Sequence, residues 1–260
     1  MGREALNLKK ARVLISNDDG VHAPGLKLLE KAMRKLAKEV WVVAPETEQS
    51  AASHSLTLRR PLRIRKLSGR RFAVDGTPTD AVLLGVNQVM QGKPPDLVLS
   101  GVNRGGNLGE DVTYSGTVAA AMEGTLLGFP SVALSLVTDD RRLAKWSTAE
   151  HWVGQVIERL CTAVWPENVL INVNFPDVPA AQVKDIEVTV QGRRKIGSEF
   201  AEGRDPRGEA YFWIGAQRSE DRSKRGTDLE AVSRGAIAVT PLCLDLTHRP
   251  TFKSMQAAFA

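Results

Sequence analysis

Short apolar runs alternate with amphipathic segments along most of this 260-residue chain. The first run, residues 12–16, is followed by Pro24, which suits a first helical turn, and by apolar residues at helical spacing. Helix-like segments then separate further apolar runs, at residues 40–44, 96–100, 131–137 and 169–175. Runs that are apolar throughout are typical of parallel strands buried on both faces. The order of elements predicts an α/β fold, with a three-layer Rossmann-like core and a mostly parallel sheet.

The helices expected between these strands have recognisable starts. A Thr-Pro pair opens a segment with helical spacing over residues 77–90, and Ser115 is a good N-cap for an alanine-rich helix that ends near Gly128. Ser147 and Glu150 have the spacing of a capping box, in which each side chain accepts a hydrogen bond from the other residue's backbone amide. This pair predicts the start of another helix.

The last third of the chain has a different composition. Residues 191–228 are rich in Gly, Arg, Glu and Asp, interrupted by the cluster Tyr211-Phe212-Trp213-Ile214. Because such a cluster is costly to leave in water, we expect a protruding hairpin or arm that packs on another subunit, rather than a disordered insertion. A closing strand is expected at 236–239. Within one functional domain, we therefore distinguish a Rossmann-like core, residues 11–190, from a C-terminal extension, residues 191–260, that carries the arm, the closing strand and oligomer contacts.

Composition excludes several classes of protein. With 42% hydrophobic and 25% charged residues, the chain is that of an ordinary globular protein. No apolar run approaches the roughly 20 residues needed to cross a membrane, and the first ten residues lack the apolar segment of a secretory signal. Cys161 and Cys243 show no disulfide or zinc-binding pattern, so a reducing cytoplasmic location is expected.

The net charge of +5 is a mild excess, concentrated between Arg59 and Arg71. Apolar residues alternate with arginines at 62–65, as in a half-buried strand with a basic outer face, and a second short strand is expected at 72–74. Nucleic-acid binding through this block is the alternative, and it would be strongly salt-dependent. It is the weaker interpretation, because the block lacks interleaved aromatic residues and any known binding motif.

The first candidate for chemistry is the tetrad Asn17-Asp18-Asp19-Gly20, directly after the first predicted strand. In open α/β sheets, ligands bind at the carboxyl ends of the strands, and two carboxylates there favour a hard cation. Adjacent side chains of a strand point to opposite faces, so both acids can reach one ion only if the strand stops by Asp18. A solvent-exposed turn is the alternative interpretation.

Two further segments offer neutral ligands. A glycine-rich loop is expected at 101–109, after another buried strand, and in it Asn103 provides an oxygen donor suited to a hard cation. The polar loop 46–55 carries Ser50, whose hydroxyl can bind a metal, and His54, which can shuttle a proton. Each segment alone is also compatible with an ordinary flexible loop.

A fourth candidate is the helix start at Ser115-Gly116-Thr117. No acidic residue occupies its first turn, so the free amides and the positive end of the helix dipole are open to an anion such as phosphate. Asn107, near the end of the glycine-rich loop, is a further candidate phosphate contact. Ordinary capping is the alternative interpretation, and a P-loop is excluded because its Gly-Lys-Ser/Thr ending is absent.

Taken together, these motifs resemble the SurE family of nucleotidases, the survival-protein-E phosphatases. The resemblance covers residues 12 to about 245 and rests on Asn17-Asp18-Asp19-Gly20, Ala44-Pro45, Ser50 with His54-Ser55, Gly76-Thr77-Pro78-Thr79-Asp80, Ser100-Gly101-Val102-Asn103-Arg104-Gly105, Tyr114-Ser115-Gly116-Thr117, Glu123-Gly124, Thr227-Asp228 and Val239-Thr240-Pro241-Leu242. There are two departures. Gln49 stands where many members carry a basic residue, and the segment before Ala11 is an added leader.

The resemblance implies a divalent-metal phosphomonoesterase that acts on nucleoside 5′- and 3′-monophosphates, and in some members on short polyphosphate. It implies one Mg²⁺ or Mn²⁺ per subunit, and a homodimer or homotetramer whose subunits exchange the C-terminal part. The implied metal ligands are Asp18, Asp19, Ser50 and Asn103. On this hypothesis the segment 115–117 holds the phosphate, and His54 is the candidate proton donor to the leaving nucleoside.

Two other functions are compatible with an acidic pair at a strand end. A zinc deacetylase or amidase would need histidine ligands, and none adjoins Asp18 in the sequence. A nucleotide-binding regulator would bind the same ligand without turnover. Nucleotide hydrolysis is the better interpretation, because it also accounts for the neutral oxygen donors and the anion site.

Overall fold

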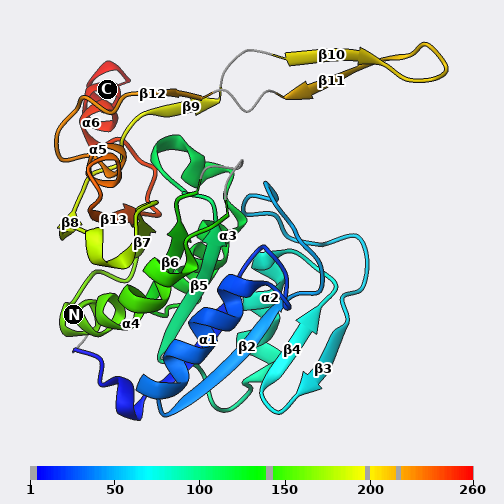
Figure 1. Ribbon diagram of the computed structural model, residues 1–260, viewed down its shortest axis with the longest axis vertical. Helices are drawn as coiled ribbons and strands as arrows, with labels where there is room; N and C mark the ends of the chain where they lie inside the picture. Colours follow the sequence, from blue (N-terminus) through cyan, green and yellow to red (C-terminus); the bar gives the residue numbers. More distant parts are fainter. Residues whose placement is uncertain (1–4, 139–142, 197–199, 215–217, 260) are drawn as a thin grey trace.

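The computed structural model describes residues 5–138, 143–196, 200–214 and 218–259. Its main strands are β1 (Arg12–Ser16), β2 (Glu39–Pro45), β3 (Ile64–Ser68), β4 (Arg71–Val74), β5 (Leu97–Arg104), β6 (Ser131–Leu136), β7 (Val169–Phe175), β8 (Ile186–Val188) and β13 (Ile237–Cys243). They form one nine-stranded sheet in the order β3-β4-β2-β1-β5-β6-β7-β13-β8 (Figure 1). The run from β4 to β7 is parallel, whereas β3 is antiparallel to β4 and β13 is antiparallel to β7.

Helices cover both faces of this sheet. The longer elements are α1 (Pro24–Leu36), α2 (Pro78–Leu84), α3 (Gly116–Leu126) and α4 (Trp146–Thr162), with short turns η1 (Leu8–Lys10), η2 (Gly85–Val89), η3 (Gly109–Thr113) and η4 (Ala180–Gln182). Val13 and Ile15 of β1 belong to the core cluster that includes α1 and α4, whereas Leu14 belongs to the cluster that includes α2 and α3 (Figure 1). The three-layer α/β prediction is confirmed. No helix in the described ranges is long and apolar enough to span a bilayer.

The chain reverses its direction across the sheet at β1. The connection through α1 leads to β2 on one side of β1, and the chain later returns to the other side at β5. Loops that leave β1 and β5 at their carboxyl ends therefore diverge and open a crevice between them. The acidic tetrad, which follows β1, lies at this crevice.

Strand β5 is longer than the sequence predicted. The glycine-rich loop expected at 101–109 is wrong in its first part, because β5 continues to Arg104. Its pairing with β6 is interrupted after Ser100 and resumes where Asn103 pairs with Ser135. An irregularity of this kind bends a strand without ending it. Asn103 is therefore held by a strand rather than by a free loop.

A capping box is present at the start of α2, and not at the start of α4, where the sequence predicted one. In α2, the Thr77 hydroxyl accepts a hydrogen bond from the Asp80 amide at 3.1 Å, and the Asp80 carboxylate accepts one from the Thr77 amide at 2.8 Å. The expected box at Ser147 is wrong, because α4 begins one residue earlier, at Trp146, without a side-chain cap. Glu150 instead accepts from Lys31 Nζ at 2.7 Å, which joins α4 to α1.

The short strand predicted at 62–65 lies at the edge of the sheet. It begins at Ile64 and runs to Ser68, and Ile64 itself is exposed. The expectation of a half-buried strand is therefore wrong at that position. An edge strand has a neighbour on one side only, and few groups of the core reach it.

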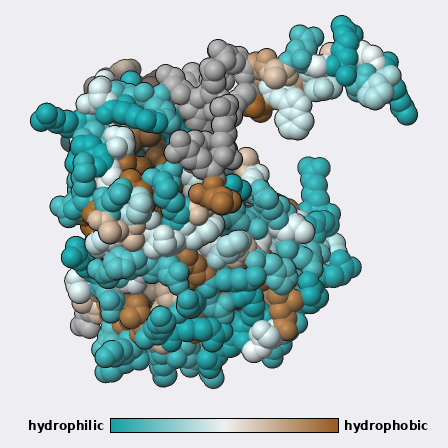
Figure 2. Space-filling view, in the orientation of Figure 1, coloured by the Kyte–Doolittle hydropathy of each residue, from teal (hydrophilic) through white to brown (hydrophobic). Residues whose placement is uncertain are grey.

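The C-terminal part contains two antiparallel ribbons. Strands β9 (Arg194–Ile196) and β12 (Arg218–Glu220) pair near the body, and β10 (Phe200–Arg204) pairs with β11 (Ala210–Ile214). The β10–β11 hairpin extends away from the body, and the face of the body in view is mostly hydrophilic (Figures 1 and 2). The predicted protruding hairpin is confirmed, and the aromatic and aliphatic side chains of its second strand are exposed. Its packing on another subunit remains a prediction.

Two helices and the closing strand follow the ribbons. They are α5 (Asp228–Ser233), β13 and α6 (Arg249–Ala258). Strand β13 enters the main sheet between β7 and β8, so the C-terminal extension supplies part of the core sheet. The sequence prediction missed α6, whose Phe252 and Met255 are exposed.

The buried carboxylate of Asp228 joins three parts of the chain. It accepts hydrogen bonds from the backbone amides of Gly109 at 2.9 Å, Gly192 at 2.8 Å and Leu229 at 2.8 Å. These amides belong to the start of η3, the approach to β9 and the first turn of α5. Buried amides that lose their acceptor keep the full cost of desolvation, so this carboxylate fixes the base of the arm against the core.

We predict that Asp228→Ala lowers the free energy of unfolding by about 3 kcal/mol, because amides on three segments lose one buried acceptor. Urea denaturation followed by circular dichroism measures this change. Asp205 is a matched control, since it also accepts from two backbone amides, of Arg207 and Glu209, but at the exposed tip of the hairpin. Asp205→Ala should cost less than about 1 kcal/mol. Equal losses in the two variants would contradict the role assigned to Asp228.

Candidate active site

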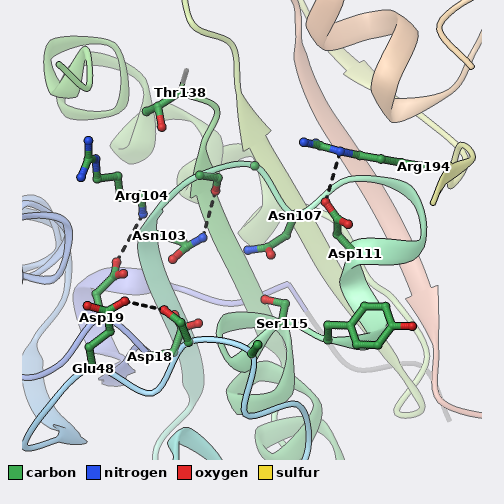
Figure 3. Close-up of a pocket in the computed structure, with 15 residues that line it drawn as sticks. Asp18, Asp19, Glu48, Asn103, Arg104, Asn107, Asp111, Ser115, Thr138 and Arg194 are labelled. Carbon is green, nitrogen blue, oxygen red and sulfur yellow. Dashed lines mark hydrogen bonds and ion pairs between the residues drawn. The ribbon is translucent and has the colours of Figure 1, made fainter. Parts of the chain in front are cut away.

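A cavity of about 510 Å³ lies at the carboxyl ends of β1 and β5 (Figure 3). Most of the residues singled out in the sequence line it, namely Asp18, Asp19, Ser50, Asn103, Asn107 and Ser115. They come from five separate segments of the chain, which the parallel sheet brings to one edge. Three candidates do not line it, namely His54, Gly116 and Thr117.

The two aspartates occupy a bend rather than a strand. Strand β1 stops at Ser16, so the requirement that it end by Asp18 is met. The Asn17 side-chain amide donates from Nδ2 to the Gly20 carbonyl at 3.0 Å, and Gly20 has a φ of 95°. A left-handed residue of this kind closes a tight corner and favours glycine. Beyond the strand the alternation of side chains ends, so both carboxylates face the same cavity.

Asp18 is buried against the start of α3. The Thr117 hydroxyl donates to its carboxylate, and so does the Thr117 backbone amide. A Cβ on Gly116 would lie 2.8 Å from the Cβ of Asp18, so glycine is needed for this close approach. Gly116 and Thr117 therefore support Asp18 from behind.

The first turn of α3 is less open than the sequence suggested. Ser115 caps it by accepting from the Val118 amide at 3.0 Å, and the Thr117 amide is directed at Asp18. The positive end of this helix therefore acts on the buried carboxylate. Ser115 still lines the cavity, where its hydroxyl proton can be donated to a ligand.

The electrostatics of the aspartate pair are unfavourable without a cation. Burial raises the pKa of Asp18, in spite of its hydrogen bonds from Thr117. Burial, together with the neighbouring Asp18, raises the pKa of Asp19 to about 7, although the Arg104 amide donates to its Oδ2 at 3.3 Å. Glu48 acts in the same direction on both acids. A cation bound in this polar cavity would stabilise the charged form of both carboxylates and so lower their pKa values.

The neutral donors beside the pair fit a hard divalent cation. The Asn103 amide nitrogen donates to the Gly105 carbonyl at 2.9 Å, and its carbonyl oxygen points toward the aspartates (Figure 3). The Ser50 hydroxyl donates to Glu48 at 2.6 Å, so its oxygen lone pairs remain available. Oxygen-only donor sets of this kind suit Mg²⁺ or Mn²⁺. Within the described ranges no three His, Cys, Asp or Glu side chains gather at a metal-binding spacing, so a cation here depends on the neutral oxygens.

His54 lies outside the cavity lining. Its Nε2 is 3.0 Å from Oε2 of Glu123, a buried residue of α3. The same loop is held by Ser53, whose amide donates to the Tyr114 carbonyl at 3.2 Å and whose hydroxyl donates to the Thr113 carbonyl at 2.8 Å. These contacts fasten the loop that carries Ser50 onto η3 and α3.

Several residues that line the cavity were not predicted as site residues, although Arg104, Gly105 and Tyr114 belong to motifs quoted for the family resemblance. They are Glu48, Ala51, Arg104, Gly105, Gly106, Asp111, Tyr114, Thr138 and Arg194. Most are next to candidates in the sequence, and that proximity was the available signal. Arg194 is different, because it comes from the base of the arm, where its Nε lies 3.3 Å from Asp111 and 3.0 Å from Glu220 (Figure 3). No sequence motif marked it.

The basic block between Arg59 and Arg71 is largely neutralised within the chain. Its ion pairs are Arg60 and Arg63 with Asp75, Arg65 with Glu46, Arg70 with Glu39, and Arg71 with Glu30. Arginines that are paired in this way offer a weaker field to a phosphate backbone than a free patch would. This arrangement disfavours the nucleic-acid interpretation.

Comparison with known proteins covers the whole of this architecture. A family model described as "Survival protein SurE" matches residues 13–198. The 5′-nucleotidase SurE of Paramagnetospirillum magneticum is 70% identical over 248 residues, which cover 95% of each chain. The 5′-nucleotidase SurE of Rhodospirillum rubrum is 57% identical over 256 residues, covering 97% of this chain and 98% of the relative.

A solved structure agrees with these matches. The crystal structure of the SurE protein from Aquifex aeolicus superposes with a TM-score of 0.84 at 39% identity, covering 96% of this chain and 100% of that one. The family match also includes every segment that builds the cavity, from the aspartate corner to Arg194. This chain therefore belongs to the SurE family.

Proposed function

We propose that the protein is a divalent-metal-dependent phosphomonoesterase that hydrolyses nucleoside 5′-monophosphates to a nucleoside and phosphate. The observation that carries the proposal is the pair Asp18 and Asp19, brought to one cavity with the neutral oxygens of Ser50 and Asn103. Relatives 50–70% identical over most of the chain bear the name 5′-nucleotidase, which supports the same activity here.

In the proposed site, Asp18 and Asp19 balance the charge of one Mg²⁺ or Mn²⁺, and Ser50 and Asn103 complete its protein ligands. A bound divalent cation polarises phosphoryl oxygens and lowers the pKa of a coordinated water. The acids alone would repel a phosphate dianion, and the lining holds four carboxylates, with Glu48 and Asp111 beside the pair, against the two arginines Arg104 and Arg194. Substrate binding itself should therefore depend on the cation.

Ser115 and Asn107 are the proposed phosphate contacts, because both line the cavity. Asn107 is held by the network around it, donating from Nδ2 to Ser135 at 2.8 Å and accepting from Asn172 at 2.8 Å. Its amide has a second N–H that can be donated to a phosphoryl oxygen. Gly116 and Thr117 contribute indirectly, by fixing the position of Asp18. Preorganised donors of this kind stabilise the charge that develops on the transferred group.

For His54 we propose a positioning role. Its pairing with Glu123 holds the loop of Ser50, and it lies outside the cavity lining, so we do not assign it proton transfer to the leaving nucleoside. We extend the proposal to nucleoside 3′-monophosphates and, as a side activity, to short polyphosphate, on the family resemblance.

The assembly and location belong to the same proposal. We infer a homodimer or homotetramer formed through the C-terminal arm, because Phe212, Trp213 and Ile214 are exposed on β11 and would be covered by a second copy. The free cysteines Cys161 and Cys243 are compatible with a cytoplasmic location.

A nucleotide-binding regulator is the second candidate, because the same cavity could hold a nucleotide without turning it over. Nucleotide binding in Mn²⁺ with no release of phosphate would favour it. A zinc deacetylase is disfavoured, since no histidine is among the described residues that line the cavity.

The central test is phosphate release from a panel of 5′- and 3′-nucleotides and polyphosphate, with Mn²⁺ and with EDTA. We expect activity only with the metal, and at least a ~100-fold lower rate in Asp19→Asn, because one charged ligand is lost. Asp96→Asn is the control, since Asp96 accepts from the Arg12 amide at 2.7 Å, at the amino end of β5. Full turnover by Asp19→Asn, or in EDTA, would refute the site assignment.

Asn103→Ala should weaken metal affinity rather than remove the chemistry, because it deletes one neutral oxygen and leaves both carboxylates. We expect the rate at limiting Mn²⁺ to fall by about tenfold and to recover in part at saturating Mn²⁺. Metal titrations of the rate, and isothermal calorimetry with Mn²⁺ alone, measure this. A loss of rate that no concentration of Mn²⁺ reduces, with unchanged metal affinity, would contradict ligation by Asn103.

The raised pKa of Asp19 predicts how the metal-free protein responds to pH. An acid whose pKa rises from 3.8 to about 7 on folding binds its proton more tightly in the folded state. The contribution of Asp19 to stability is therefore greatest below about pH 4 and is lost as pH rises toward 7, by at most about 1.4 kcal/mol per pH unit. Urea denaturation in EDTA at several pH values should show that the stability of the wild type, measured relative to Asp19→Asn, falls over this range. Mn²⁺ should reverse the loss near pH 7, and identical pH profiles for the two proteins would contradict the prediction.

A further inference from the structure

Tyr114 is the only aromatic side chain among the described residues that line the cavity. The residue is 54% exposed, although an aromatic ring would gain by burial. A single exposed tyrosine needs no explanation by itself. This tyrosine, however, lies on the wall of the cavity that contains the aspartate pair, where a ligand could contact its ring.

The backbone of Tyr114 is fixed on both sides. Its amide donates to the Asp111 carbonyl at 3.0 Å, at the end of η3, and its carbonyl accepts from the Ser53 amide at 3.2 Å. The next residue, Ser115, caps α3 and lines the cavity. The ring is thus attached to a rigid turn that also carries a proposed phosphate contact.

The distance along the chain from Tyr114 to the reacting end is short. Thr117, which bonds to Asp18, is three residues away, so the two Cα atoms are within about 11 Å. A mononucleotide has its phosphate at one end and its base at the other, joined by one ribose. With the phosphate at the aspartates, the wall to which Asp111, Tyr114 and Ser115 contribute is within reach of the base.

The described residues that line the cavity include one aromatic ring. Apart from Tyr114, they carry charged or polar side chains, or are glycines and Ala51. Every nucleobase has an apolar π-face, which stacks well on an aromatic ring and is indifferent to the identity of the base. We propose that Tyr114 stacks on the nucleobase of the substrate, so that the enzyme prefers nucleotides to phosphomonoesters without a base. This inference rests on the proposed nucleotidase activity.

The test compares Tyr114→Ala with wild type on adenosine and cytidine 5′-monophosphates and on ribose 5-phosphate, which lacks the base. We expect kcat/KM for both nucleotides to fall about 5- to 100-fold, the range found for loss of one stacking platform. Turnover of ribose 5-phosphate should change less than about twofold, which also shows that the variant is folded. Tyr114→Phe keeps the ring and should recover most of the lost rate on nucleotides.

Tyr211 provides the matched control, since it is the other tyrosine of the chain and is 46% exposed, on the hairpin strand β11. Tyr211→Ala should leave the ratio of nucleotide to ribose 5-phosphate turnover unchanged. An equal loss on all three substrates in Tyr114→Ala, or no loss on any, would overturn the proposal.

Equilibrium binding of the same three ligands in Mn²⁺ separates this inference from the proposed activity. If wild type binds nucleotides without releasing phosphate, the proposed activity is wrong. The stacking role can then still be tested by comparing the affinity of wild type and Tyr114→Ala for each ligand. Weaker binding of nucleotides alone to Tyr114→Ala would support it, and unchanged binding of all three ligands would overturn it.

Discussion

The burial of two adjacent carboxylates, Asp18 and Asp19, at one cavity is the constraint around which this end of the molecule is built. The two carboxylates leave β1 at a glycine corner and face one cavity, where burial makes their charges costly. The surrounding structure compensates in part, through Thr117 and the first turn of α3 behind Asp18 and through the Arg104 amide beside Asp19. The negative charge that remains uncompensated can bind a cation. The neutral oxygens of Ser50 and Asn103 lie beside the two carboxylates as further ligands.

The sequence predicted those parts of the fold in which local pattern and tertiary environment agree. Strand β1 is apolar from Val13 to Ile15 because both of its faces are covered, and the pattern alone indicated this. The cap at Ser115 is equally local, since a hydroxyl and the amide three residues later decide it. The strand end before Asp18 followed from geometry, because two adjacent side chains can share a ligand only outside a strand.

The parts that failed depend on partners distant in the sequence. Glycine at 101 suggested a loop, but pairing with β6 resumes at Asn103 and keeps the segment in the sheet. Glu150 has the spacing of a capping box, yet Lys31 of α1 provides its partner. Arg194 reaches the cavity only because β9, at the base of the arm, packs beside η3, and no nearby motif could indicate that. Among the candidate residues, Gly116 and Thr117 contact Asp18, and this contact between distant segments was not predicted; their role in phosphate binding remains a prediction.

Strand β13 has a consequence for the order in which the chain can assemble. It lies between β7 and β8, and it is made after more than sixty residues of arm and loop have followed β7. Until then the outer edge of β7 has no neighbour, and an unpaired edge of an apolar strand is a template for pairing with another chain. On the ribosome, every residue that lines the cavity except Arg194 is thus synthesised before β7, while the sheet is completed only when β13 is added. The nascent protein is most exposed to aggregation during the synthesis of its arm.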